Sequence, residues 1–371
     1  MKIIHIILGK ARLDRMNGIN KVVHNLALHQ AELGHEIELW GITPTPNVEL
    51  PPRAYGMRFF QASKHPFGLD QSLKQAIAAL EGQKVHFHLH GGFIPVYYRV
   101  ARRLVKHGIP YVVCPHGALT PGAWLVNTRK KKWYFRLFDA YVLRHAATVQ
   151  FLGETQFHAA DRLLPLERKL LIPNGQNLDE LEFEWSPMDR PPVPVLSFCG
   201  RLDARTKGLD LLFAALQAHQ EQGGYCQLWI IGDGEDRQWL EQEAIDRQIQ
   251  DRVVFWGSQY GNEKLNLLAH SDAFVHTSRN EGMPTGVLEA AGMGLPCILS
   301  PETNLASIFA DAQAGWKAAP NTVEAIADAL HQVEQAWETQ QIKQLGQNAQ
   351  NLIKTEFNWK RIADRVMAAY E

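Results

Sequence analysis

Short apolar runs with the character of strands alternate with amphipathic helical segments along the chain. In the first half, residues 19–34 carry apolar side chains at helical spacing, and they lie between the strand-like runs KIIHIIL and HEIELW. The same alternation continues through VHFHLH, PYVVC, ATVQF, VPVLSFC, CQLWII, RVVFWG, AFVHTS and PCILS. Strands that alternate with helices predict an α/β protein whose parallel sheets are covered on both faces.

The length favours two domains. At 371 residues the chain is long for a single core. Four prolines lie between residues 187 and 194, after an Asn-Gly turn and before a new apolar strand, and we interpret this stretch as a linker. We therefore expect two doubly wound, Rossmann-like domains of similar size with a cleft between them. Ligands of such sheets bind beyond the carboxyl ends of the strands.

Composition limits the partners and the compartment. The 38 basic side chains balance 39 acidic ones, so the net charge does not favour nucleic acid. The four cysteines match no metal-binding or disulfide pattern and suit a reducing compartment. The chain has no signal-peptide pattern and no apolar run of the ~20 residues that a membrane span needs. We expect a cytoplasmic location, or one on the cytoplasmic face of a membrane.

Two predicted strand ends carry features suited to an anion. Gly18 begins the first predicted helix, where outward-facing backbone N–H groups can bind an anion. Gly and Asn are also common helix caps, so the alternative is an ordinary helix start. Arg201 and Lys207 flank the loop after the predicted strand 193–200. Two cations beside the start of a helix can bind a diphosphate. The alternative is that both are solvated charges of an ordinary loop. Neither GxGxxG nor a P-loop is present, which disfavours a nicotinamide dinucleotide.

Two carboxylates follow a later strand. Glu281 lies in the loop RNEGMPTG, and Glu289 lies inside the helix that follows. Carboxylates and exposed backbone amides are suitable partners for sugar hydroxyls, as at the ribose of dinucleotide sites. The amides available beside Pro284 are those of Gly282, Met283 and Thr285.

The order of these motifs resembles the retaining glycosyltransferases of family 4, which have the GT-B fold. The resemblance covers nearly the whole chain and rests on GRL…KG, IPNG, IIGDGED, FWGS, AHSDAFVHTSRNEG, EGMPTGVLE and the terminal FNWKRIADRVMAAY. It implies an acceptor-binding N-terminal domain, residues 1–180, which the returning C-terminal helix 357–371 joins. The donor-binding domain would comprise residues 181–356.

The resemblance also implies roles for single residues on the donor side. Arg201 and Lys207 would bind the diphosphate of a nucleotide sugar, and Glu289 would bind the ribose hydroxyls. Glu281, with the amides of Gly282, Met283 and Thr285, would contact the donor sugar near its 3- and 4-hydroxyls.

On the N-terminal side, His116 of VCPHGAL resembles the family histidine beside the 6-position of the sugar. Gly18 corresponds to the second glycine of the family's N-terminal Gly-Gly loop, and Asn17 stands where the family has the first.

The mechanism that the resemblance implies is a front-face transfer with retention of configuration. It uses no covalent nucleophile, and the catalytic residues would be His116, Glu281, Arg201 and Lys207. Charge stabilisation of the departing diphosphate would carry most of the catalysis. Because two side-chain cations and a helix dipole already neutralise the phosphates, we expect no metal and no cofactor.

Two further stretches leave alternatives open. His86, His88 and His90 share one face of a strand, but three alternate strand positions alone do not complete a tetrahedral metal site, and His90 would line the acceptor side instead. Residues 127–145 combine basic and aromatic side chains, which suits either peripheral contact with a membrane or a core helix with a solvated start.

The predicted function is transfer of a hexose from a nucleotide sugar, UDP being the commonest base in the family. The acceptor would be a glycan or a lipid-linked glycan of the cell surface. A GT-B nucleotide-sugar epimerase is the alternative enzyme, and a dinucleotide-dependent oxidoreductase is a weaker one. A non-catalytic sugar-nucleotide sensor is disfavoured because the cations, both glutamates and His116 are all present.

Overall fold

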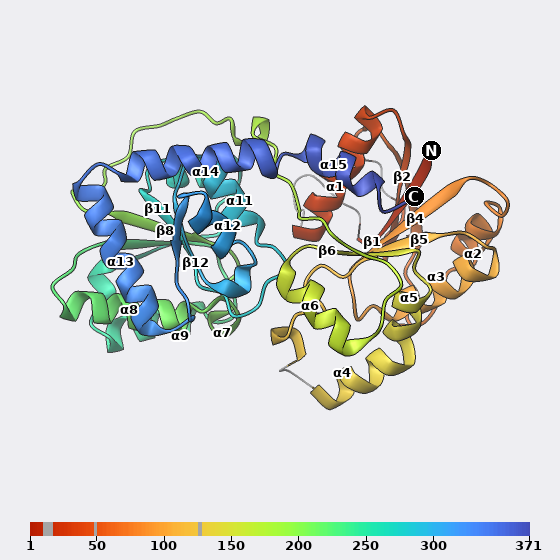
Figure 1. Cartoon of the computed structure of the whole chain (residues 1–371), viewed down its shortest axis with the longest axis horizontal. Helices are drawn as coiled ribbons and strands as arrows, with labels where there is room; N and C mark the ends of the chain where they lie inside the picture. The colour runs from red at the N-terminus through yellow and green to blue at the C-terminus, as the bar shows by residue number, and fades with distance from the viewer. Residues whose placement is uncertain (10–17, 48–49, 125–127) are drawn as a thin grey trace. The chain divides into compact units, whose positions relative to one another are not determined.

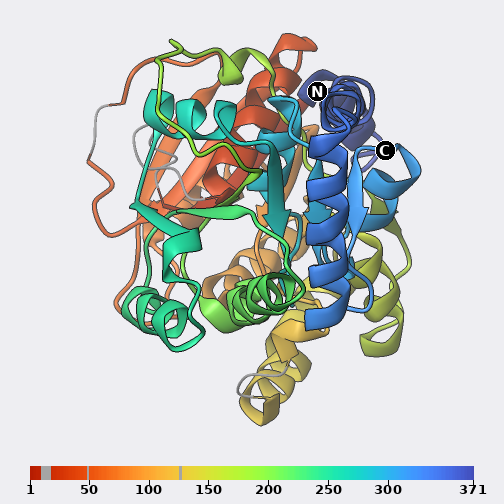
Figure 2. The same ribbon diagram turned by 90° about the vertical axis from the view of Figure 1, so that its left-hand side faces the viewer.

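The computed structural model describes residues 1–9, 18–47, 50–124 and 128–371 (Figure 1). The chain divides into two compact units. The first comprises Met1–Asn174 and Trp359–Glu371, and the second comprises Gly175–Asn358. Each unit has one parallel sheet with helices on both faces (Figure 2), which confirms the α/β prediction.

The first unit, where described, has a sheet of seven strands in the order β3-β2-β1-β4-β5-β6-β7. The strands are β1 (Lys2–Leu8), β2 (Glu36–Thr43), β3 (Gly56–Gln61), β4 (Val85–His90), β5 (Tyr111–Cys114), β6 (Thr148–Phe151) and β7 (Lys169–Leu171). The α-helices are α1 (Gly18–Glu32), α2 (Gln71–Ala78), α3 (Pro95–Lys106), α4 (Thr128–Tyr134), α5 (Ala140–Arg144), α6 (Glu154–Leu163) and α15 (Trp359–Met367).

The alternation of side chains along β1 assigns each face of this sheet to a different set of helices. Ile3 and Ile7 belong to one apolar cluster with residues of α1 and α15. Ile4 and Ile6 belong to another cluster with residues of α2 and α3. Because side chains on a strand alternate, His5 points to the same face as Ile3 and Ile7, under α1 and α15.

The second unit has a sheet of six strands among the described residues, in the order β10-β9-β8-β11-β12-β13. The strands are β8 (Val195–Cys199), β9 (Gln227–Ile231), β10 (Val253–Gly257), β11 (Ala273–His276), β12 (Cys297–Leu299) and β13 (Gly315–Lys317). The α-helices are α7 (Ala204–Lys207), α8 (Leu209–Glu221), α9 (Arg237–Asp246), α10 (Gly261–Ala269), α11 (Thr285–Gly292), α12 (Ala306–Asp311), α13 (Val323–Glu338) and α14 (Ile342–Glu356).

The proline-rich stretch that we interpreted as a linker belongs to the second unit. Its neighbourhood is fixed to α10, where the N–H of Glu184 donates to Asn262 Oδ1 over 2.6 Å. The Trp185 ring stacks on His270 at 5.4 Å. The units instead divide after Asn174 and after Asn358. The boundaries that the resemblance implies, 180 and 356, lie six and two residues from these divisions. The prolines mark a packed segment rather than the crossing.

Gly208 allows two loops of the second unit to approach closely. It lies between α7 and α8 with a φ of +69°. A Cβ atom at this position would lie 2.0 Å from the carbonyl oxygen of Thr277, just beyond β11. Only glycine therefore fits here, and the close approach brings the residues after β8 against those after β11.

Gly208→Ala is predicted to destabilise the second unit by about 3 kcal/mol or more, because a left-handed backbone costs roughly 1–2 kcal/mol and the clash adds to it. Gly223→Ala is the matched control, since Gly223 also has positive φ, +87°, but an added Cβ would meet no atom within 4 Å. Urea unfolding of both variants measures the difference. Equal losses of stability would contradict the steric explanation.

Candidate functional site

The predicted donor residues of the second unit follow neighbouring strands at the centre of the sheet. β8 pairs with β9 on one side and with β11 on the other. The chain continues from β8 to β9 on one side and from β11 to β12 on the other, and such a topological switch point is where doubly wound sheets bind ligands. Arg201 and Lys207 follow β8, and Glu281 follows β11.

Lys207 and Glu281 form a buried ion pair at this point. The Lys207 Nζ atom lies 2.5 Å from Glu281 Oε1, and the two side chains are 19% and 13% exposed. His276, the last residue of β11, places Nε2 2.9 Å from the same oxygen. Burial would raise the pKa of Glu281, but the hydrogen bond from His276 and the charge of Lys207 lower this pKa to about 2. Glu281 is therefore ionised, and its oxygens are acceptors.

His276 is a buried, neutral donor to this carboxylate. Burial lowers the pKa of His276 despite the neighbouring Glu281. A neutral ring that donates from Nε2 to Glu281 carries its lone pair on Nδ1. That Nδ1 atom is buried and has no hydrogen-bond partner among the residues that the structure describes.

Asn304 fixes the backbone of the loop that carries Glu281. Its side-chain amide donates to the carbonyl oxygens of Glu281 and Gly282 over 3.1 and 3.0 Å. Met283 is buried at 7% exposure, and Thr285 begins α11. Thr285 thus lies in the first turn of α11, where N–H groups have no partner within the helix, whereas Gly282 and Met283 precede the N-cap residue Pro284.

The remaining two predicted donor residues have different surroundings. Glu289 is buried in α11, and Lys264 Nζ of α10 lies 2.7 Å from its Oε1 atom. The Arg201 side chain is 74% exposed, and its ion pair is a 3.4 Å contact with Asp203. The structure therefore joins Lys207 to Glu281, whereas Arg201 pairs with Asp203 and Glu289 pairs with Lys264.

Three residues of this site escaped the sequence analysis: His276, Lys264 and Asn304. His276 had a signal, because it is a polar residue at the end of an apolar strand, five positions before Glu281. Lys264 and Asn304 had none, because their distance from the glutamates in sequence gives no hint that their side chains reach them.

In the first unit, His90 and His116 lie at two adjacent strand ends. His90 ends β4 and His116 follows β5, and His90 Nδ1 lies 3.0 Å from His116 Nε2. His116 has a φ of +46°, a conformation that is uncommon for any residue but glycine and that gathers at functional sites. Burial lowers the pKa of His116 to about 4, so the ring is neutral at neutral pH.

Gly18 is the first residue of α1, and an added Cβ there would meet no atom within 4 Å. Asn17, which stands where the family has its first glycine, lies outside the described residues. The approach of this loop to a phosphate therefore stays a prediction.

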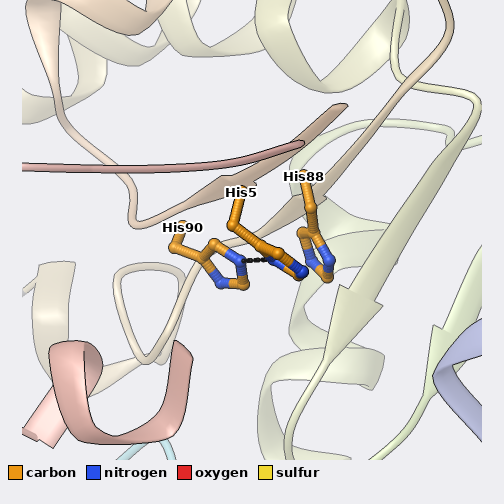
Figure 3. Close-up of side chains that lie close together, drawn as sticks. All are labelled: His5, His88 and His90. Atoms are coloured by element: carbon orange, nitrogen blue, oxygen red, sulfur yellow. Dashed lines mark hydrogen bonds between the residues drawn. The ribbon is translucent and has the colours of Figure 1, made fainter. Parts of the chain in front are cut away.

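A cluster of three buried histidines has the composition of a metal site. His5, His88 and His90 offer nitrogen atoms within 4.8 Å of one another (Figure 3). The trio differs from the one in the sequence analysis, because His5 of β1 takes part and His86 does not. His5 Nδ1 and His90 Nε2 are only 2.9 Å apart, a hydrogen bond rather than two ligands around an ion. The absence of a metal from the mechanism stays a prediction.

Residues 128–144 form α4, a π-helical turn at Phe135–Asp139, and α5. Trp133 and Leu137, four residues apart, are 67% and 57% exposed. Beside them lies a groove of about 590 Å³ whose floor is largely apolar and whose cations are Lys132, Arg136, Arg144 and Arg162. Within the described residues, none of the four cations has an ion pair or a hydrogen bond to a side chain. No described helix is long and apolar enough to cross a membrane.

Comparison with known proteins identifies the family. Residues 184–352 match the family model of glycosyl transferases group 1, and residues 17–175 match that of the glycosyl transferase 4-like domain. The chain belongs to this glycosyltransferase family. The assignment from motifs is therefore confirmed.

Relatives of similar length agree with this assignment. A GDP-mannose:cellobiosyl-diphosphopolyprenol alpha-mannosyltransferase of Xanthomonas oryzae is 26% identical over 100% of this chain and 96% of its own. A glycogen synthase of Mycobacterium tuberculosis is 27% identical over 96% of this chain and 91% of its own.

Among solved structures, Anabaena HepE in complex with UDP superimposes with a TM-score of 0.76 at 17% identity, covering 99% of both chains. Sucrose-phosphate synthase from Thermosynechococcus elongatus gives a TM-score of 0.74 at 18% identity, with 100% and 98% covered. These likenesses confirm the GT-B fold.

Lys207→Met is predicted to destabilise the protein by about 2–3 kcal/mol at neutral pH, because it leaves the Glu281 carboxylate buried without its cation. The loss should shrink as the pH falls from the usual pKa of a glutamate toward about 2, the pKa of Glu281 in the folded protein, since protonation removes the buried charge. Urea unfolding at two pH values measures both effects. Arg201→Met is the control, and this exposed site should change stability by no more than about 0.5 kcal/mol. A loss that is the same at both pH values would contradict the ion-pair explanation.

Proposed function

We propose that this chain is a retaining glycosyltransferase that moves a hexose from a nucleotide sugar, a UDP-sugar in the first instance, to a glycan or lipid-linked acceptor. The observation that carries the proposal is the pair of Lys207 and Glu281 at the switch point of the second sheet. There a cation for a diphosphate and a carboxylate for sugar hydroxyls lie side by side. Arg201, exposed after β8, is available to a phosphate.

In this proposal each donor residue acts through the contacts described above. Lys207 and Arg201 stabilise the departing diphosphate, whose charge grows as the bond to the sugar breaks. Glu281, which is ionised and hydrogen-bonded to His276, accepts hydrogen bonds from the hydroxyls of the sugar. The backbone amides of Gly282, Met283 and Thr285 donate hydrogen bonds to the same sugar. Glu289 accepts hydrogen bonds from the ribose hydroxyls, while its Oε1 atom is paired with Lys264.

The acceptor hydroxyl attacks the same face of the sugar that the diphosphate leaves, and a phosphate oxygen takes its proton. His116, neutral and held in a strained backbone conformation, contacts the sugar from the first unit. Gly18 opens α1 toward the phosphates, and His90 supports the acceptor side. The proposal requires neither a metal nor a cofactor, because side-chain cations balance the charge of the diphosphate.

The similar proteins differ in the nucleotide base of the donor that they are named or solved with. HepE was solved with UDP and with UDP-glucose, which supports a uridine donor. The Xanthomonas relative, which is more similar in sequence, is named for GDP-mannose. Both fit a site that grips diphosphate and sugar through the same side chains, so the base is a question for measurement.

Thermal denaturation with a panel of nucleotide sugars tests the donor. One nucleotide family is predicted to raise the midpoint by several degrees at saturating concentration, since a ligand that binds only the folded state stabilises it. Arg201→Ala and Glu289→Ala should each weaken that shift. NAD is the control ligand. No shift with any nucleotide sugar, or a shift with NAD that survives both substitutions, would refute the proposed donor site.

We also propose that the groove between residues 128–144 and α6 receives the phosphate groups of a lipid-linked acceptor at the cytoplasmic face of a membrane. Lys132, Arg136 and Arg144 stand four or eight residues apart and share one helix face, and Arg162 reaches the groove from α6. Trp133 and Leu137, exposed next to these cations, have the character of side chains that enter a membrane interface. The apolar floor suits the first part of a lipid chain.

A Lys132→Ala/Arg136→Ala variant is predicted to bind vesicles of phosphatidylglycerol about 30-fold more weakly than the unchanged protein, at about 1 kcal/mol for each cation removed. Arg102→Ala/Lys106→Ala is the matched control, because it removes two exposed cations from α3 of the same unit. Vesicle sedimentation measures both. Equal weakening in the two variants would mean that net charge, and not the groove, attracts the membrane.

A further inference from the structure

A second group of metal-ligating side chains lies within the second unit, between α8 and α13. The two helices pack against each other (Figure 1), and residues of both belong to one apolar cluster. His219 of α8 faces His331 and Glu334, which lie three residues apart on α13 and so on the same side of that helix. One ligand atom of each residue lies within 4.8 Å of those of the other two. We call these three residues the helix-pair cluster.

The facing atoms of the helix-pair cluster are spaced much as the ligands of one ion are. His219 Nε2 lies 3.1 Å from Glu334 Oε2, and His331 Nδ1 lies 3.8 Å from the same oxygen. Ligands that bind zinc tetrahedrally at about 2.0–2.1 Å are about 3.3 Å from one another. The two separations lie on either side of that value, so small side-chain movements bring the atoms to bonding distance.

The cluster of His5, His88 and His90 in the first unit lacks this convergence. Both nitrogens of His5 and both of His90 already face other side chains in a row of hydrogen bonds. In the helix-pair cluster, each histidine turns one nitrogen toward Glu334 and the other toward a neighbour outside the cluster. An ion there replaces only contacts within the cluster.

Groups outside the helix-pair cluster orient its ligands on α13. The Tyr225 N–H donates to Glu334 Oε1 over 3.0 Å, which leaves Oε2 to face the histidines. Gln222 Oε1 lies 2.9 Å from His331 Nε2. Ligating histidines commonly donate their second N–H to an oxygen in this way. A bound cation selects the oxygen of Gln222 rather than its NH₂ group, because His331 then keeps its N–H at Nε2 and its lone pair at Nδ1.

The loop after α8 leaves room beside His219. A Cβ atom on Gly224 would lie 2.3 Å from His219 Nε2, so a larger residue there would cover this nitrogen. Nδ1, the other nitrogen of the ring, lies 3.9 Å from Cys226 Sγ. His219 is buried, whereas His331 and Glu334 are partly exposed. An ion can therefore enter from solvent and keep a water molecule as its fourth ligand.

The carboxylate of Glu334 has no Lys or Arg partner among the residues that the structure describes. Its contacts are the two histidines and the Tyr225 N–H. The charge of Arg252 reaches His219, but the Arg252 guanidinium stacks on the Tyr225 ring at 4.2 Å and donates to the Gly224 carbonyl oxygen over 2.8 Å. The Glu334 carboxylate is therefore available to a cation.

We infer that His219, His331 and Glu334 bind a divalent transition-metal ion of the zinc class. Two imidazoles and a carboxylate are ligands that such ions take. The ion ties α8 to α13 and stabilises the second unit. It lies apart from the proposed donor site, since His219 is ten residues from Leu209, about 15 Å along the helix, and Lys207 lies just before Leu209. The inference therefore leaves the proposed reaction free of metal.

Titration of the metal-free protein with Zn²⁺ and Co²⁺ tests the inference, with a chain that carries no histidine tag. One ion per chain is expected to bind with a Kd of about 1 μM or tighter, since three ligands supply most of the binding energy of a four-ligand zinc site. Co²⁺ should give the visible absorption of a four-coordinate site, which Zn²⁺ should abolish. Weak binding that does not saturate, or the spectrum of hydrated Co²⁺, would overturn the inference.

His331→Gln should weaken the binding of Zn²⁺ at least about 100-fold, because a lost ligand costs more than a lost outer contact. The side chain is partly exposed, so the fold should tolerate the change. His107→Gln is the matched control, because His107 lies 3.0 Å from Glu81 but no third ligand joins them among the described residues. This variant should bind Zn²⁺ like the unchanged protein. Binding that survives His331→Gln, or that both substitutions weaken equally, would overturn the inference.

Gln222→Met tests the outer contact. It removes the acceptor for the N–H of His331 Nε2, so the affinity for Zn²⁺ should fall about 10–100-fold while one ion per chain still binds. An unchanged affinity would show that Gln222 is not a positioning residue of this site.

Thermal denaturation tests the stabilising role of the ion. Zn²⁺ at about 100 times its Kd should raise the midpoint of the unchanged protein by several degrees and leave that of His331→Gln where it was. An equal rise in both proteins would contradict a stabilising ion at this site. Neither measurement uses a nucleotide sugar, so its result is independent of the proposed function.

Discussion

The close approach of two loops beyond β8 and β11 is the constraint on which the site of the second unit depends. Gly208 lets the backbone pass against Thr277, and the Ser278 hydroxyl then donates to the Thr206 carbonyl over 2.7 Å. This contact brings Lys207 and Glu281 into their ion pair. The two charges therefore neutralise each other in a buried place, and under the proposed function a diphosphate would share Lys207 with the carboxylate.

The first unit buries polar groups by a different device. Its central strands carry neutral histidines, and each avoids the cost of a buried charge by staying deprotonated while it hydrogen-bonds to its neighbours. Register makes this arrangement possible, because His5 of β1 stands directly beside His88 of β4 and on the same face. Hydrogen bonds then join rings that lie on three different segments of the chain, His5, His90 and His116.

Most of the fold could be predicted from the sequence, because strand and helix periodicities are local. The predicted strands at 2–8 and 85–90 coincide with β1 and β4, and the predicted strand at 273–278 extends two residues beyond β11. The proline-rich stretch does not mark the division between the units, because proline occurs in any rigid extended segment and here lies in one that packs on α10. Of the site, the residues at strand ends could be predicted, whereas Lys264 and Asn304 make contacts that only the tertiary structure creates.

The proposed contact between Glu281 and the donor sugar would make the site selective for a hydroxyl group. Glu281 is ionised down to about pH 2 and so only accepts hydrogen bonds. In the proposed complex it must therefore be matched by a hydroxyl donor, and a sugar that lacks this hydroxyl would leave a buried acceptor unpaired. A site built to bind a hydroxyl rejects the analogue without it far more strongly than an apolar pocket rejects an added one. Under the proposed function, selectivity for a hexose with this hydroxyl thus follows from the protonation state of Glu281.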